Sequence, residues 1–369
     1  MLKTKKEEQN SILYLKKYCK EVHTFPIASD ESKFYLYTLV LKNLFSFSPF
    51  TAQKYYSKKM IDKINDICSR INIDIVHFDT LILAEYRNNL KEIPWILVNH
   101  NVESLLMRRQ AVKENNPLKL VYLFFQYLKL KIYEKRYCPK SKAVIVVSHQ
   151  DKQELERIAP KGHYHVIENG VDTGYFCKQA LNKKQNILIM IGGWSWMPNH
   201  DSFKYFYNKI YPLIKKNIST VKLWIVGANP TQDMINIAAR DSSIKIFGLV
   251  DDVRPLYEQA SVFLVPLRAG GGTRLKILDA LSMEKAIVTT SIGCEGIFVK
   301  NNIHLLIADT PEMFAEKTLL LLKDKHLNET LGKNGRKLML EKYDWNLIGP
   351  KMEDVYNSVI TSTQLIKHA

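Results

Sequence analysis

Residues 261–280 read SVFLVPLRAGGGTRLKILDA and join an apolar run to three consecutive glycines and then to an amphipathic stretch. The run SVFLV has the length and β-branched content of a strand, and the stretch 273–283 is long enough for a helix. Glycines in such a turn let the backbone approach a ligand, because no Cβ stands in the way. The helix start offers free N–H groups and a positive dipole end to an anion. This segment therefore predicts an anion-binding turn in an α/β fold.

The same alternation of strand and helix runs through the whole C-terminal half. The expected strands cover 186–191, 221–226, 244–247, 261–265 and 286–290, and the expected helices cover 202–216, 231–239, 253–260, 273–283 and 311–323. Each stretch between two strands is long enough to cross over and cover a sheet face. Because strand–helix–strand repetition implies a parallel sheet, we expect a doubly wound domain here.

The N-terminal half shows a weaker pattern of the same type, with expected strands at 21–27, 73–78, 94–99 and 143–147. A chain of 369 residues exceeds one hydrophobic core, and the polar stretch 172–185 is the expected linker. We therefore predict an N-terminal domain over 1–176 and a C-terminal domain over 186–342. The chain opens with a charged, helix-like segment over 4–19. We thus expect the first strand–helix unit of the N-terminal domain, about 50 residues, to be missing.

The composition favours a globular protein with negatively charged partners. Apolar residues make up 46% of the chain, and 53 Lys and Arg against 37 Asp and Glu give a net charge of +16. The lysines are scattered and no nucleic-acid-binding signature is present, so phosphate-bearing substrates are expected rather than nucleic acid. The five cysteines form no CxxC pair, which predicts neither disulfides nor zinc. Without an apolar run of about 20 residues or a signal peptide, a cytoplasmic location is expected.

Charged residues beside the triple glycine suit a diphosphate. We expect the oxygens of the diphosphate to lie over Gly271, Gly272 and Thr273. Arg274 can bind two phosphate oxygens at once, and Lys276 adds a point charge near the same turn. Asp279, one turn further on, can accept hydrogen bonds from ribose hydroxyls. The alternative is a flexible turn after which Lys276 and Asp279 pair on a solvated face and Arg274 lies on the surface.

A second glycine turn follows the expected strand 186–191. Gly192 and Gly193 precede a helix that opens near Asn199, so their backbone is expected to approach the phosphates from the other side. Trp194 and Trp196 fit a wall of this site and ordinary packing equally well.

Polar residues also follow the strands of the N-terminal half. His100 and Asn101 stand at the carboxyl end of a strand, where open α/β sheets place ligand-binding groups. Glu103 is near enough to orient His100 or to act as a base, with a purely structural histidine as the alternative. Ser148 either caps the next helix or contacts phosphate or acceptor. The histidines of 163–165 are interpreted as structural, and no metal site is predicted.

Several segments resemble glycosyltransferase family 4, particularly its bacterial polysaccharide-synthesis members, in the family's order across about residues 70–360. They are VNHNVES (98–104), VVSHQDKQEL (146–155), ENGVDTGYF (168–176), GGWSWMPNHDSFKYF (192–206), KLWIVGANP (222–230), FGLVDDVRPLYEQASVFLVPL (247–267) and GGGTRLKILDALSMEKAIVTTSIGCEGI (270–297). The resemblance implies a GT-B architecture, in which two Rossmann-like domains face each other across a cleft. It also implies that a helix over 343–369 crosses back to the N-terminal domain.

The resemblance further implies a retaining, metal-independent transfer of a sugar from a nucleotide diphospho-sugar, with no cofactor. The acceptor is then a glycan or lipid-linked glycan in cell-surface polysaccharide synthesis. The residues expected to be catalytic are His100, Arg274 and Lys276. Those expected to bind the donor are Gly192, Gly193, Asn199, Gly271, Gly272, Thr273 and Asp279. Those expected on the acceptor or sugar side are Asn101, Glu103 and Ser148.

The sequence departs from the family where members often carry two glutamates in an E-x7-E pattern, because Gly271 and Asp279 occupy those positions. A catalytically impaired, truncated relative that binds a nucleotide or a partner protein is therefore one alternative. Another enzyme on the same fold, such as a nucleotide-sugar epimerase or a phosphorylase, is a second. Residues 117–137 mix apolar residues with lysines at helical spacing, which predicts either core packing or peripheral contact with the inner face of the membrane. No oligomeric state is predicted.

Overall fold

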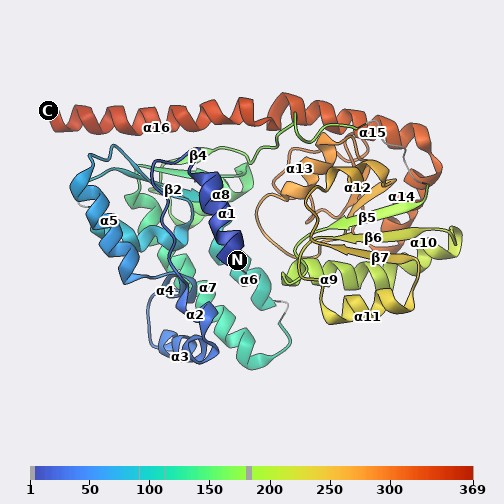
Figure 1. Cartoon of the computed structure of the whole chain (residues 1–369), viewed down its shortest axis with the longest axis horizontal. Coiled ribbons are helices and arrows are strands. Elements are labelled where there is room, and N and C mark those ends of the chain that lie inside the picture. The colour runs from blue at the N-terminus through green and yellow to red at the C-terminus, as the bar shows by residue number, and fades with distance from the viewer. Residues whose placement is uncertain (1–4, 91, 113, 180–184, 369) are drawn as a thin grey trace. The chain divides into compact units, whose positions relative to one another are not determined.

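The computed structural model describes residues 5–90, 92–112, 114–179 and 185–368 (Figure 1). The chain divides into two compact units, one of Met1–Asp74 with Ile82–Ile93 and one of Ile75–Leu81 with Pro94–Ala369. The first unit is helical, and the second contains two parallel sheets. The prediction of an α/β protein is therefore confirmed.

Short helices make up the first unit. They are α1 (Lys5–Leu15), α2 (Ala28–Glu31), α3 (Lys33–Leu44), α4 (Phe50–Lys54), α5 (Lys58–Arg70) and nearly all of the 3-10 helix η1 (Leu81–Asn89). The strand expected over 21–27 is wrong, since this segment is largely exposed and pairs with no strand in the described part of the chain. Alternating apolar residues do not suffice for a strand, because its backbone groups also need a neighbouring strand as hydrogen-bond partner.

The first sheet has four parallel strands in sequence order, β1 (Val76–Phe78), β2 (Trp95–Asn99), β3 (Ala143–Val146) and β4 (Tyr164–Val166). β2 and β3 are buried along their whole length, as expected for parallel strands that are covered on both faces. The connections contain α6 (Glu103–Val112), α7 (Pro117–Tyr137), η2 (Cys138–Lys140) and α8 (His149–Ile158). The other three strands predicted in this half are confirmed.

The second sheet has six parallel strands in the order β10-β9-β8-β5-β6-β7. The strands are β5 (Ile187–Ile191), β6 (Lys222–Val226), β7 (Ile244–Gly248), β8 (Val262–Val265), β9 (Ile287–Thr289) and β10 (Leu306–Ile307). The chain moves outward from β5 through β6 to β7 and then returns to the other side of β5 as β8. Loops at such a reversal diverge and leave room for a ligand at the carboxyl ends of the strands.

Helices cover both faces of the second sheet (Figure 1). They are α9 (Met197–Tyr205), η3 (Phe206–Ile210), α10 (Tyr211–Asn217), α11 (Gln232–Arg240), α12 (Arg254–Gln259), α13 (Leu275–Ser282), α14 (Pro311–Lys323), α15 (Lys325–Leu338) and η4 (Met339–Tyr343). Alternate residues of β5 belong to different cores: Leu188 packs with α9, α10 and α14, and Ile189 packs with α12 and α13. This is the doubly wound arrangement predicted from the sequence.

The last helix, α16 (Trp345–His368), packs on the first sheet. Ile348, Val355 and Val359 share a core with Ile96 and other residues of β2 and β3. The chain thus returns from the second sheet to the first, and apolar contacts hold the returning helix there.

Gly227 lets the turn after β6 pass close to the turn after β5. Its φ is +122°, and a Cβ on it would lie 2.0 Å from the carbonyl oxygen of Gly192. We therefore expect Gly227→Ala to lower the free energy of unfolding by about 3 kcal/mol, because the backbone must shift to relieve the clash. Urea unfolding followed by circular dichroism measures this change. Gly349→Ala is the control, since no described atom beyond its own stretch of helix backbone lies within 4 Å of its Cβ position. Equal stabilities of the two variants would contradict the prediction.

Candidate functional site

The triple-glycine bend lies against the turn that follows β2. Gly270 and Gly272 have φ values of +134° and +66°, which side chains disfavour. A Cβ on Gly272 would lie 2.5 Å from Oδ1 of Asn101 and 2.6 Å from the carbonyl oxygen of His100. The predicted donor residues Gly271 and Gly272 therefore lie beside His100, predicted to be catalytic, and Asn101, predicted on the acceptor side.

The bend leads into α13, but this helix begins at Leu275 with Arg274 as its cap residue, later than the expected start at Thr273. Arg274 is only 4% exposed, and its Nη1 donates to the carbonyl oxygens of Gly271 and Gly272. The side chain thus folds under the bend and is not a surface residue. Burial lowers the pKa of Arg274. The buried Nε of Arg274 and Oγ1 of Thr273 have no hydrogen-bond partner among the described residues.

Lys276 connects α13 to the second glycine turn. Its Nζ donates to the carbonyl oxygen of Ile191 at 3.0 Å and to Oδ1 of Asn199 at 2.9 Å. Asn199 in turn donates from Nδ2 to the carbonyl oxygen of Gly193 at 3.0 Å. A Cβ on Gly192 would lie 2.7 Å from that Nδ2, so this glycine is needed for the contact. The predicted residues of the two turns are therefore brought together at the carboxyl ends of the neighbouring strands β5 and β8.

Burial shifts the pKa values of the charged residues in this cluster toward their neutral forms. Burial, together with the charge of Arg274, lowers the pKa of Lys276 to about 7. Burial raises the pKa of Asp279 to about 7 as well. Among the described residues, Asp279 has no hydrogen bond or ion pair through its carboxylate, and the solvated Lys276–Asp279 pair considered above is not formed. A bound anion would favour the charged forms of Arg274 and Lys276.

Trp194 and Trp196 differ in their surroundings. Trp194 is buried, and its indole N–H donates to the carbonyl oxygen of Val226 at 3.1 Å. Trp196 is exposed, and its ring lies 3.7 Å from the Cβ position of Gly270. Core packing therefore accounts for Trp194, and Trp196 is the tryptophan that lies beside the bend.

His100 belongs to a polar cluster at the carboxyl ends of β1 and β2. Its Nε2 lies 3.0 Å from Oδ1 of Asp79, and Nε2 of His77 lies 3.6 Å from the same oxygen. His77 also contacts the hydroxyl of Tyr356 through Nδ1 at 2.6 Å. Asp79, which the sequence analysis did not single out, is thus the carboxylate that contacts His100. Glu103 lies nearby, and burial raises its pKa to about 6 against the opposing effect of His100.

A cavity of about 380 Å³ adjoins this cluster. His77, Asp79 and His100 stand on its wall, which is otherwise mainly apolar. The apolar part comes from the first sheet and the start of α16, and includes Val98, Ile145, Val147, Ile167, Trp345, Ile348 and Met352. The cavity can accommodate an apolar group next to the polar cluster.

Ser148 is explained by helix capping. It accepts a hydrogen bond from the amide of Asp151 at 3.0 Å, and its Oγ donates to Oδ2 of Asp151 at 2.6 Å. The histidines of 163–165 border a surface hollow beside Lys140. In the part of the chain that the structure describes, His, Cys, Asp and Glu form no group that could hold a metal ion. The helices described there include none with the length and apolarity to cross a membrane.

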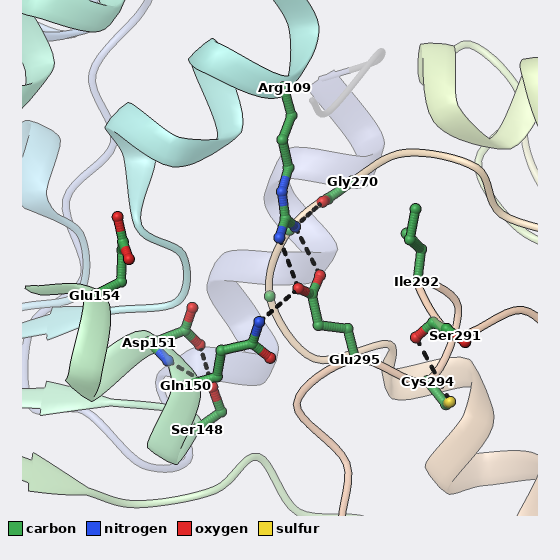
Figure 2. A network of polar contacts seen from close by, with 12 residues as sticks. Arg109, Ser148, Gln150, Asp151, Glu154, Gly270, Ser291, Ile292, Cys294 and Glu295 are labelled. Atoms are coloured by element: carbon green, nitrogen blue, oxygen red, sulfur yellow. Dashed lines mark hydrogen bonds and ion pairs between the residues drawn. The ribbon is translucent and has the colours of Figure 1, made fainter. Parts of the chain in front are cut away.

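Three further residues contact the bend or its neighbours, and the sequence analysis missed them (Figure 2). Both guanidinium Nη atoms of Arg109, on α6, lie 2.6 Å from the carboxylate oxygens of Glu295, which follows β9. Nη1 of Arg109 also donates to the carbonyl oxygen of Gly270 at 2.8 Å. Gln150, on α8, donates to Oε1 of Glu295 at 2.9 Å. Glu295 lies in a segment with family resemblance, but no local pattern indicates a partner 186 residues away.

Two sequence families match the chain. Residues 21–175 match Glycosyltransferase Family 4, and residues 185–324 match Glycosyl transferases group 1. An uncharacterised 44.6 kDa protein in the cps region of Klebsiella pneumoniae is 24% identical over 253 residues, 66% of this chain and 64% of that protein. The capsular polysaccharide biosynthesis glycosyltransferase CapM of Staphylococcus aureus is 25% identical over 222 residues, 58% of this chain and 53% of that protein. The chain thus spans less than two thirds of the length of either relative.

Solved structures share the fold. A glycosyltransferase from Rickettsia africae ESF-5 has a TM-score of 0.64 at 19% identity and covers 81% of this chain and 80% of its own. Anabaena Alr3699/HepE, solved in complex with UDP, has a TM-score of 0.62 at 13% identity and covers 81% of this chain and 82% of its own. The match to Glycosyl transferases group 1 spans both glycine turns. Residues 21–175 therefore belong to Glycosyltransferase Family 4 and residues 185–324 to Glycosyl transferases group 1, and the chain has the GT-B fold with two Rossmann-like domains.

Proposed function

We propose that this chain transfers a sugar from a nucleotide diphospho-sugar to a glycan or lipid-linked glycan during synthesis of a cell-surface polysaccharide. The main support is the convergence of Arg274 and Lys276 with two glycine turns at the carboxyl ends of β5 and β8. The UDP in the Anabaena HepE structure and the capsular role in the name of CapM also favour it. In this proposal the reaction takes place on the cytoplasmic side of the membrane. Residues 117–137 contact the inner face of that membrane peripherally.

The proposed role of the two cations follows from the charge that develops during transfer. Breaking the bond between the sugar C1 and the diphosphate oxygen leaves negative charge on the leaving nucleoside diphosphate. Arg274 and Lys276, fixed in place before the reaction, stabilise that charge at little reorganisation cost. Chain cations therefore supply the charge, and the proposed reaction uses no metal or cofactor. Asp279 receives hydrogen bonds from the ribose hydroxyls.

The acceptor occupies the His100 side of the site. We assign the cavity beside His100 to the acceptor or its carrier group, because its polar rim and apolar wall suit an amphipathic molecule. Asp79 orients His100 through the 3.0 Å contact, and Asn101 and the carbonyl oxygen of His100 both lie against Gly272 of the bend. Transfer with retention of the anomeric configuration is part of the proposal, and rests on the family resemblance alone.

Replacing Arg274 tests the phosphate site. We expect Arg274→Ala to lower turnover by about 10²- to 10³-fold, because one fixed positive group is lost where charge develops. The measurement is release of nucleoside diphosphate from UDP-, GDP- and dTDP-sugars in the presence of membrane extract as acceptor source. Arg240→Ala, at the exposed end of α11, is the matched control. Transfer at the parental rate by the Arg274 variant would refute this assignment.

The lowered pKa of Lys276 predicts a pH dependence of nucleotide binding. Above pH 7 the amine is mostly neutral in the free protein, so binding UDP requires uptake of a proton. We expect the affinity for UDP to fall between pH 7.5 and 9 by up to about tenfold per pH unit. Calorimetry in buffers of different ionisation enthalpy measures both the affinity and the proton uptake.

The matched variant is Lys276→Arg, because arginine stays charged over this range. Its UDP affinity is expected to change little with pH and to show no proton uptake. The same pH slope in both proteins would exclude Lys276 as the titrating group. Below pH 7 the two proteins are expected to converge.

A further inference from the structure

The contacts of Arg109 join α6 to the glycine bend through the backbone (Figure 2). One guanidinium makes a two-point ion pair with Glu295 and also donates to the carbonyl oxygen of Gly270. The side chains of Arg109 and Glu295 are 30% and 19% exposed, so water screens this pair less than it screens a surface pair. Gln150 holds Glu295 from a third element. Arg109 is therefore fixed where it meets Gly270.

The direction of the Gly270 carbonyl has a consequence for the next amide. A trans peptide is planar, and its C=O and N–H point in opposite directions. All peptide bonds of the described chain are trans, so the bond to Arg109 turns the N–H of Gly271 away from α6. Gly270 has a φ of +134° and no side chain to limit rotation, so the bend by itself does not fix the plane of the peptide between Gly270 and Gly271.

In the part of the chain that the structure describes, the amide groups from the Gly270–Gly271 peptide onward in the bend are free to bind a ligand. Among the described residues, the N–H groups of Gly271, Gly272 and Thr273 have no acceptor in the protein. The buried Oγ1 of Thr273 and Nε of Arg274 also lack partners. A row of unused donors around one bend favours an oxyanion as the missing acceptor.

We propose that Arg109 is a positioning residue of the donor site: by holding the Gly270 carbonyl it orients the Gly271 amide toward the donor diphosphate, and Glu295 and Gln150 keep Arg109 in place. This proposal rests on the proposed function. Arg109 lies on α6, in the same half of the molecule as the acceptor-side residues, yet it forms part of the donor site. The space between α6 and the bend has a volume of about 20 Å³, enough for a water molecule. A diphosphate therefore binds on the face of the bend away from Arg109.

Arg109→Met and Arg109→Lys test the proposal, with Arg108→Met as the matched control on the exposed side of the same helix. Binding of UDP, GDP and dTDP is measured by calorimetry, and donor and acceptor KM by product release. We expect Arg109→Met to weaken nucleotide binding and to raise the donor KM by about tenfold or more, as loss of a charged hydrogen bond does. The acceptor KM stays within twofold, and Arg109→Lys shows a smaller loss.

A charge exchange separates positioning from simple tethering. In the double variant R109E/E295R the ion pair can form again, but a carboxylate at position 109 cannot donate to the Gly270 carbonyl. We expect the thermal unfolding temperature to recover and nucleotide binding to remain weak. Recovery of both, or parental binding by Arg109→Met, overturns the positioning role. If the unaltered protein binds none of the three nucleotides, the proposed function itself fails.

Discussion

The close approach of two backbones shapes this site. The bend at Gly270–Gly272 passes so near the turn at His100 and Asn101 that a single Cβ on Gly272 would overlap Oδ1 of Asn101. The contact brings the carboxyl end of β8 beside that of β2, and with it the donor-side and acceptor-side residues. A larger residue at position 272 would force the two loops apart.

Positive charge beside the bend is held at a cost. Arg274 is buried against backbone carbonyl oxygens, and Lys276 is held by one carbonyl and one amide oxygen. Neither cation thus has a carboxylate of the described chain at hydrogen-bond distance. The lowered pKa values of both groups express the cost of keeping a cation away from water. Cations arranged in this way are poorly compensated in the free protein and well placed for an anion. The free protein therefore loses some stability that the bound state regains.

Much of the architecture follows from local patterns. Five of the six strands of the second sheet match the predicted ranges closely, since a buried parallel strand is a short apolar run wherever it occurs. The two-residue strand β10 was not predicted, and the helix expected over 202–216 begins earlier, at Met197. The segment 21–27 shows the limit of this reasoning, because its apolar alternation is present but none of the strands that the structure describes lies beside it. The start of α13 shows a finer limit: Thr273 was expected to open the helix, but the bend extends further and the helix begins at Leu275.

Local patterns in the chain were enough to predict the α/β class, the two glycine turns and the cations beside them, because these features are carried by residues close together in the chain. The carboxylate that contacts His100, the backbone atoms that Arg274 and Lys276 contact, and the meeting of Arg109 with Gly270 and Glu295 are known only from the folded protein. These partners come from different strands and helices. A hydrogen bond depends on distance and direction in space, and periodicity along the chain contains neither for residues that far apart.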